Sequence, residues 1–205
     1  MSDLQIYGAA PSRTFRTLWM AEELGLAYTH HPVNARGGTR TPEFLALNPN
    51  GHVPVIKDGT LVLCESMAIN LYLARKHGKG LWPDNLADEG RVYQWTFWAV
   101  NEVEGLLIEV LLNRLLLAPD KRDEAAAARA IEKMQKPLAV LESALATSDY
   151  LLGPAFTVAD LNVASVLSWA RVGKVDLSAY AKVTAWLRQC FGRPASRKVA
   201  EMARS

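Results

Sequence analysis

The segment GHVPVIKDGTLVLCES, from Gly51 to Ser66, narrows the possible folds more than any other part of the chain. Two apolar runs with strand character flank the turn KDGT, which predicts a β-hairpin, and a helical pattern begins directly afterwards. Pro54 stands where the first strand should begin, although proline removes a backbone donor and is costly inside a sheet. Either Pro54 is a tolerated edge position, or the Val53–Pro54 peptide bond is cis and turns the preceding backbone outward.

Strand and helix signals alternate through the sequence before residue 79. Residues 4–7 and 27–33 read as extended, and residues 12–25 predict a helix with an apolar stripe that ends at a glycine. A short helix is predicted from Thr41 as N-cap with proline at its first position, and another helix over residues 66–78. With the hairpin, the order is βαβαββα, which predicts an α/β layer built on one sheet.

The rest of the sequence shows only helical patterns. Residues 79–87 contain glycine, proline and asparagine without periodicity, which predicts a linker between a domain at 1–78 and an all-helical domain at 88–205. An apolar stripe predicts a helix that Pro137 should kink, and its members are Ile131, Met134, Leu138, Leu141 and Leu145. Thr157 and Asp160 form a capping-box pattern at the start of a further helix, so Asp160 is expected to be structural.

Composition excludes several classes of function. The chain has 205 residues, half of them hydrophobic, and a net charge of +2, so no basic field for nucleic acid or a membrane surface is indicated. Its two cysteines form no CxxC motif, which argues against a disulfide scaffold or a structural zinc site. The N-terminus has no signal-peptide pattern, and charged residues break the richest apolar run, so we expect a cytoplasmic protein that does not cross a membrane.

Ser66 and Glu65 stand at a predicted helix start and allow two interpretations. Ser66 is either a simple N-cap or part of an anion site, since the N–H groups and dipole of a helix N-terminus favour a carboxylate. In the second case Glu65 would pair with an ammonium group, and the two residues together would suit the end of an α-amino acid.

Other chemistry-bearing residues have a structural interpretation. His30 and His31 are neighbours on an extended segment, so their side chains point to opposite faces and cannot bind one metal ion. No His/Cys cluster elsewhere indicates a metal site. The aromatic residues Trp95, Phe97 and Trp98 are typical of a core, although aromatic rings also line small-molecule sites.

Taken in order, these features resemble the glutathione transferase superfamily. The resemblance covers nearly the whole chain, and its most specific parts are NPNGHVPVI followed by ESMAINLYL, and FTVADLNVA in the helical half. It implies a thioredoxin-like domain followed by an all-helical domain. It also implies a cytoplasmic bacterial-type enzyme, usually a homodimer, that serves in detoxification and uses glutathione as co-substrate.

The resemblance also implies roles for individual residues. Val53, before a cis Pro54, would pair with the cysteinyl backbone of glutathione. Glu65 and Ser66 would hold its γ-glutamyl end. His52, Arg40 and the turn around Arg13 would supply further contacts.

The pattern leaves three candidates for the group that activates the thiol. In many serine-type members the hydroxyl lies one place earlier, where this chain has Pro11. Ser12 is our first choice as the catalytic residue, because we expect it at a helix N-terminus. Tyr7, on the strand before it, is the second choice, and backbone N–H groups of the same turn are a third possibility.

Three functions fit these residues. The first is conjugation of the glutathione thiolate to small, electrophilic, hydrophobic compounds, with a second-substrate pocket near Trp98, Asn101 and Glu102. The second is glutathione-dependent reduction of disulfides or peroxides, in which bound glutathione supplies the redox sulfur; the lack of a cysteine near the first helix disfavours the cysteine-type classes of the family but does not separate these two functions. The third is a transferase-like domain that only binds, which does not need the intact Val53–Pro54 and Glu65–Ser66 elements.

Overall fold

The computed structural model describes residues 3–34 and 37–204. Contacts between residues divide the chain into two units, Met1–Trp82 together with Gly192–Ser205, and Pro83–Phe191. The predicted domain boundaries, 1–78, 79–87 and 88–205, stay a prediction. The contacts add that the last segment of the chain packs with the first unit, which is therefore built from two separate stretches of sequence.

The first unit has the βαβαββα order of elements and the single sheet that the sequence predicted. Among the described residues, four strands pair in the spatial order β2-β1-β3-β4: β1 (Leu4–Tyr7), β2 (Thr29–His31), β3 (Val55–Asp58) and β4 (Leu61–Cys64). β1 is parallel to β2 and antiparallel to β3, and β3 is antiparallel to β4. The hairpin turn is shorter than predicted, because Lys57 and Asp58 still pair with β4.

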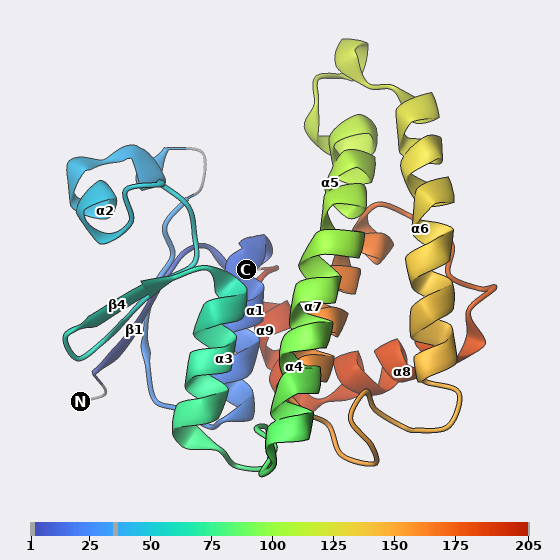
Figure 1. Ribbon diagram of the computed structural model, residues 1–205. Helices are drawn as coiled ribbons and strands as arrows, with labels where there is room; N and C mark the ends of the chain where they lie inside the picture. The colour runs from blue at the N-terminus through green and yellow to red at the C-terminus, as the bar shows by residue number, and fades with distance from the viewer. Residues whose placement is uncertain (1–2, 35–36, 205) are drawn as a thin grey trace. The chain divides into compact units, whose positions relative to one another are not determined.

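Helices complete the core of the first unit: α1 (Phe15–Glu23), α2 (Pro42–Leu47), α3 (Ser66–His77) and α9 (Pro194–Met202). α1 and α3 lie side by side, and α3 also packs against β3 and β4 (Figure 1). The core between sheet and helices contains fully buried aliphatic side chains from β1, α1, β3 and α3: Ile6, Leu18, Ile56, Ile69 and Leu73. The alternation in β1, with Leu4 and Ile6 buried, directs the side chains of Gln5 and Tyr7 to the other face.

α9 is held on α1 by ion pairs as well as packing. The Arg193 guanidinium donates to both carboxylate oxygens of Glu23, at 2.7 and 2.8 Å, and Lys198 Nζ lies 2.8 Å from Glu22 Oε2. The two-point Arg193–Glu23 geometry is the strongest form of such a pair. This ion pair holds α9, near the C-terminal end of the sequence, on α1.

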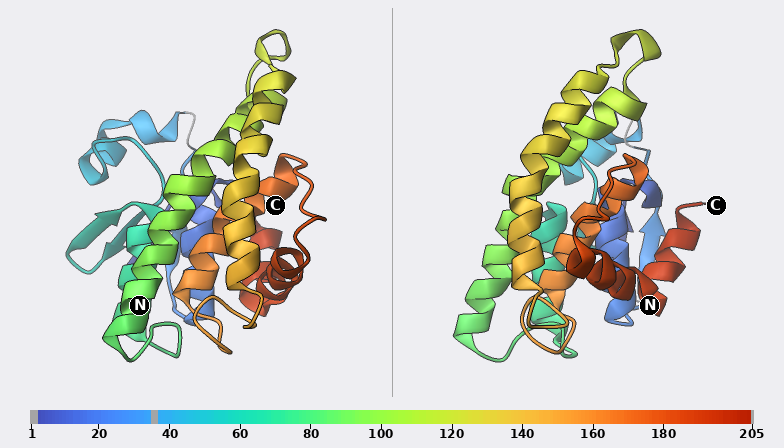
Figure 2. Two further views of the ribbon diagram at one scale, coloured as in Figure 1. Left: turned by 45° about the vertical axis from the view of Figure 1, so that its right-hand side comes forward. Right: turned by 90° about the vertical axis from the view of Figure 1, so that its right-hand side faces the viewer.

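Regular structure in the described residues of the second unit is helical, as predicted. Its helices are α4 (Leu86–Trp98), α5 (Gly105–Leu111), α6 (Glu124–Ala144), α7 (Val158–Val172) and α8 (Ala181–Gly192). The segment Ala99–Glu104, with wider helical turns, joins α4 to α5, and α6 lies beside α5 (Figure 2). α6 continues through Pro137 and buries Met134, Leu138 and Leu141 of the predicted stripe.

Asp160 is the centre of a buried hydrogen-bond network at the start of α7. Its carboxylate accepts hydrogen bonds from the backbone N–H and the hydroxyl of Thr157, at 2.9 and 3.0 Å. It also accepts bonds from the Leu151 N–H and the Trp186 indole N–H, both at 2.9 Å. Burial raises the pKa of Asp160 above its ordinary value, and these hydrogen bonds act in the opposite direction. The predicted capping box is confirmed, and it also ties in the loop before α7 and helix α8.

In the part of the chain that the structure describes, no helix has the length and apolar character needed to cross a bilayer.

Candidate functional site

The turn that follows β1 depends on glycine at position 8. Gly8 has φ +133°, its N–H donates to the His31 carbonyl at 2.9 Å, and its carbonyl accepts from His30 Nε2 at 2.8 Å. A Cβ at this position would lie 2.0 Å from Thr14 Oγ1 and 2.8 Å from Val53 Cβ. Only glycine therefore lets the end of β1, the turn after it and the start of β3 come together.

Ser12 lies in this turn and not at the first position of α1, so the predicted start of the helix was wrong. Pro11 and Ser12 have non-helical backbone angles, and the regular helix begins at Phe15. The Ser12 hydroxyl lies 2.7 Å from the Ala9 carbonyl and 2.9 Å from Thr14 Oγ1, and it accepts the Thr14 N–H at 3.1 Å. A serine side chain that bonds to nearby backbone competes with the helix, which explains the later start.

Tyr7 is engaged on its own strand. Its phenol donates to Gln5 Oε1 at 2.7 Å, and its ring stacks on His31 with centroids 4.5 Å apart and planes 11° from parallel. His31 Nε2 lies 3.1 Å from the same Gln5 oxygen. The polar end of Tyr7 is thus held by residues of β1 and β2.

The loop before β3 is organised by Asn48 and Gly51. The buried Asn48 amide donates to the His52 carbonyl at 2.8 Å, and its oxygen accepts the Asn50 N–H at 3.1 Å. A Cβ on Gly51 would lie 2.6 Å from a guanidinium nitrogen of Arg40. The structure therefore brings Arg40 against the turn that presents His52, although the two residues are far apart in sequence. The sequence analysis did not single out Asn48, whose position inside NPNG is its only local signal.

The Val53–Pro54 peptide bond is cis, as the sequence led us to expect. Pro54 is buried, while Val53 is half-buried and precedes the first residue of β3. Within the described residues, the N–H and C=O of Val53 make no backbone hydrogen bond.

Ser66 is the first residue of α3, and its side chain is buried against Arg16 of α1. The Arg16 guanidinium donates to Ser66 Oγ at 3.3 Å, and only 2% of Arg16 and 5% of Ser66 is exposed. Glu65, the N-cap residue, is exposed and has φ +71°, a left-handed conformation that costs a non-glycine residue about 1–3 kcal/mol. The sequence analysis missed Arg16, because an arginine within an apolar helix pattern gives no local sign of its partner.

The remaining predicted residues are placed as follows. Arg13 is exposed in the turn before α1. In the second unit, Trp98 is half-buried at the end of α4 and meets Trp95 edge-on with centroids 5.2 Å apart. Asn101 and Glu102 are exposed in the segment that follows.

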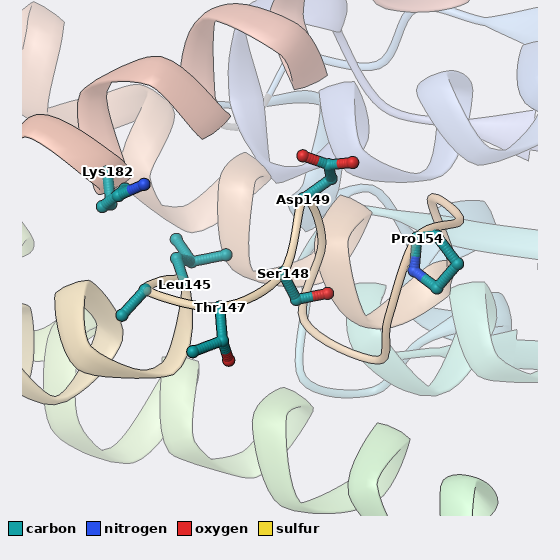
Figure 3. Close-up of a pocket in the computed structure, with 7 residues that line it drawn as sticks. Leu145, Thr147, Ser148, Asp149, Pro154 and Lys182 are labelled. Carbon is teal, nitrogen blue, oxygen red and sulfur yellow. The ribbon is translucent and has the colours of Figure 1, made fainter.

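The second unit also has a polar depression of about 410 Å³ between the end of α6 and the start of α8. Figure 3 shows its lining, in which Lys182 comes from α8 and the other residues come from the segment that follows α6: Leu145, Ala146, Thr147, Ser148, Asp149 and Pro154. The predicted substrate residues Trp98, Asn101 and Glu102 are not among these residues.

The histidines of β2 serve local structure. His30 bonds to the Gly8 carbonyl and His31 to the Gln5 amide, so each ring has a different partner. In residues 3–34 and 37–204, acidic, histidine and cysteine side chains form no group of three that could hold a metal ion.

Comparisons with known proteins agree with this arrangement. Residues 2–75 match the family model of the glutathione S-transferase N-terminal domain, and residues 107–194 match that of the C-terminal domain. Glutathione S-transferase 1 of Zea mays is 34% identical, covering 98% of each chain. Glutathione S-transferase GstB of Escherichia coli (strain K12) is 32% identical, covering 90% of each chain.

A solved structure shows the same fold. The theta class glutathione S-transferase from the citrus canker pathogen Xanthomonas axonopodis pv. citri, crystallised with glutathione bound, has a TM-score of 0.89. It is 34% identical, and the match covers 97% of both chains. The class that the fold defines is thus a thioredoxin-like domain with a helical domain, the glutathione S-transferase fold. The chain belongs to the glutathione S-transferase family, and it is a glutathione transferase.

Proposed function

We propose that this chain joins the thiolate of glutathione to small, electrophilic, hydrophobic compounds, as in detoxification. The thiol first loses its proton, and the sulfur then forms a bond to an electrophilic carbon; with an aryl halide, the halide ion leaves. The observation that favours this chemistry is the serine hydroxyl in the turn after β1. The two cysteines, Cys64 and Cys190, lie instead on β4 and in α8. Without a thiol in that turn, the protein has no partner there for thiol exchange with glutathione.

Glutathione binds, in this proposal, along the first unit. The γ-glutamyl end lies at the start of α3, where Ser66 and the N–H groups of the helix take its carboxylate and Glu65 takes its ammonium group. Val53, whose backbone groups make no backbone hydrogen bond among the described residues, pairs with the cysteinyl backbone. Arg40 and His52 supply polar contacts for the rest of the tripeptide, and the position of Arg40 against Gly51, the residue before His52, supports this assignment.

Ser12 is the residue that we propose to activate the thiol, assisted by the backbone around Arg13. Its oxygen already accepts the Thr14 N–H, so its single proton is available to a sulfur once it leaves the Ala9 carbonyl. Tyr7 is the weaker candidate, because its phenol donates to Gln5.

The experiment that tests the reaction type is an activity panel with glutathione and an aryl halide, an organic hydroperoxide or a small disulfide. We expect turnover of the aryl halide, and we expect Ser12→Ala to lose most of it. Turnover of the disulfide or the hydroperoxide alone would establish the reductase alternative.

Ser12→Cys gives a sharper comparison. It places a thiol in the same turn, and we expect it to gain disulfide reduction while it loses conjugation. Cys64→Ser is the matched control for thiol chemistry outside the turn, and it should behave as the wild type does.

We propose that the second substrate lies near Trp98, Asn101 and Glu102, which belong to the end of α4 and the segment after it. Trp98 offers a half-buried aromatic surface of the kind that binds apolar molecules. Substitution of Trp98 by Ala should raise the KM for the aryl halide and leave glutathione affinity unchanged. An unchanged KM would place the apolar substrate elsewhere.

We also propose a cytoplasmic, bacterial-type enzyme that acts as a homodimer. Both cysteines are free thiols, which fits a reducing compartment. The bacterial-type membership stays a prediction, since the maize protein and the two bacterial proteins are similar to this chain to the same degree. The dimer is supported by apolar side chains exposed along one face of α4, namely Leu86, Tyr93 and Phe97.

A further inference from the structure

Arg16 is a buried cation that neither the sequence nor the proposed reaction assigns to a function. It lies on α1, fifty residues before its partner Ser66, and its guanidinium nitrogen is 3.3 Å from Ser66 Oγ. Burying a charged side chain is costly, so a chain retains one where it stabilises something else. The question is what this charge does at the start of α3.

The chemistry of the two groups settles the direction of their hydrogen bond. A guanidinium group can only donate, whereas a serine hydroxyl has one proton and two acceptor lone pairs. Ser66 Oγ therefore accepts from Arg16, and its single proton remains available for a different acceptor. Arg16 thus fixes Ser66 as a donor.

Charge acts in the same sense as this hydrogen bond. The N–H groups and the dipole at the start of α3 favour a negative group, and the buried Arg16 guanidinium lies at the same end of the helix through its contact with Ser66. The helix start and Arg16 together favour an anion that accepts a hydrogen bond from the Ser66 hydroxyl.

We infer that Arg16 is a positioning residue for the γ-glutamyl carboxylate of glutathione, and that it makes binding selective for ligands that carry this carboxylate. The inference rests on the proposed glutathione site. It predicts that Arg16 acts through Ser66 and not through the thiol or the glycine end.

A double-mutant cycle read by calorimetric titration tests this inference. The two ligands are glutathione and its decarboxylated analogue, γ-aminobutyryl-cysteinyl-glycine. For glutathione we expect Ser66→Ala and Arg16→Met each to weaken binding by about ten- to a hundredfold, the effect of losing a hydrogen bond to a charged group. In the Ser66→Ala background, Arg16→Met should add less than about threefold. For the analogue, all variants should bind like the wild type.

Thr17→Val is the matched control, since Thr17 is the next residue of α1 and is fully buried. Within the described part of the chain, its hydroxyl has no hydrogen-bond partner. The change is nearly isosteric, so it should leave the binding of both ligands unchanged.

Two outcomes would overturn the role of Arg16: equal losses with both ligands, or an undiminished loss in the Ser66→Ala background. If Arg16→Met does not fold, Arg16→Gln replaces it, because the neutral Gln amide can also accept from Ser66 and so no longer fixes its hydroxyl as a donor. Wild-type glutathione affinity in Arg16→Gln would equally overturn the role. A wild-type protein that fails to bind glutathione would instead refute the proposed site itself.

Discussion

At the residue scale, the two candidates for thiol activation differ in how their hydroxyl groups are held. The Tyr7 phenol donates to the Gln5 side chain on the same strand. The Ser12 hydroxyl donates to the Ala9 carbonyl within the turn, and its oxygen accepts a hydrogen bond from the Thr14 N–H. Moving the Ser12 proton to a ligand costs one hydrogen bond to the Ala9 carbonyl. Moving the Tyr7 phenol would also disturb its stacking on His31.

The pKa of bound glutathione distinguishes these residues. A free thiol has a pKa near ~8.5, and a shift of one pKa unit corresponds to about 1.4 kcal/mol, within the range of one good hydrogen bond. We expect Ser12→Ala to raise the pKa of the bound thiol by about one unit or more, measured by thiolate absorbance. Tyr7→Phe should leave it unchanged.

A rise only in Tyr7→Phe would refute the choice of Ser12. No rise in either variant would assign the activation to backbone N–H groups of the turn.

The backbone at single residues was predicted correctly where the signal is local. The cis bond before Pro54 and the start of α3 at Ser66 are recognisable because their neighbours in sequence define a strand entrance and a helix start, whereas the roles of these residues toward glutathione stay a prediction. Arg16 and Asn48 were missed because their partners are set by tertiary structure or by loop geometry, which no periodicity reveals.

At the element scale, two helix starts were predicted correctly from their caps. Thr41 accepts the Phe44 N–H at the start of α2, and the Thr157–Asp160 box begins α7, both as predicted. The start of α1 was wrong by three residues, because a helical pattern of apolar residues does not show that Ser12 has an extended backbone. Helix boundaries are predicted wrongly where a side chain forms hydrogen bonds with nearby backbone groups that compete with those of the helix.

Asp160 should contribute more to stability than a simple cap. Asp160→Ala leaves the buried donors of Thr157, Leu151 and Trp186 without their acceptor, so we expect it to lower the free energy of unfolding by about 3–5 kcal/mol. Urea denaturation measures this change.

The comparison variant is Asp123→Ala. Asp123 is an exposed N-cap at the start of α6 that accepts the Ala126 N–H at 3.0 Å. It should cost clearly less than Asp160→Ala. Equal losses in the two variants would mean that the additional bonds of Asp160 add nothing to the cap.

At the scale of the whole molecule, the order of elements was predictable, whereas the grouping of the last residues was not. The alternation of strand and helix signals gave the four-stranded sheet and the helical region after it. Gly192–Ser205 belongs to the first unit because Arg193 and Lys198 meet Glu22 and Glu23 of α1. In the sequence, these charged side chains are indistinguishable from those of a solvent-exposed helix face.

The proposed homodimer is tested by molecular mass in solution. Phe97→Glu places a charge on the exposed apolar face of α4, and we expect it to shift the protein from dimer to monomer in sedimentation velocity. Val172→Glu, at an exposed apolar position of α7, is the control and should leave the mass unchanged. A wild type with the mass of a monomer would refute the dimer.

The discontinuity of the first unit has a consequence for how the protein forms in the cell. A ribosome makes α1 early, but it makes α9 only after every helix of the second unit. Until then the α1 surface that α9 covers is exposed, and Glu22 and Glu23 lack their ion-pair partners Lys198 and Arg193. The packing of the first unit is therefore completed last, although its sheet is synthesised first. Until α9 has been made, the uncovered surface of α1 is accessible to chaperones.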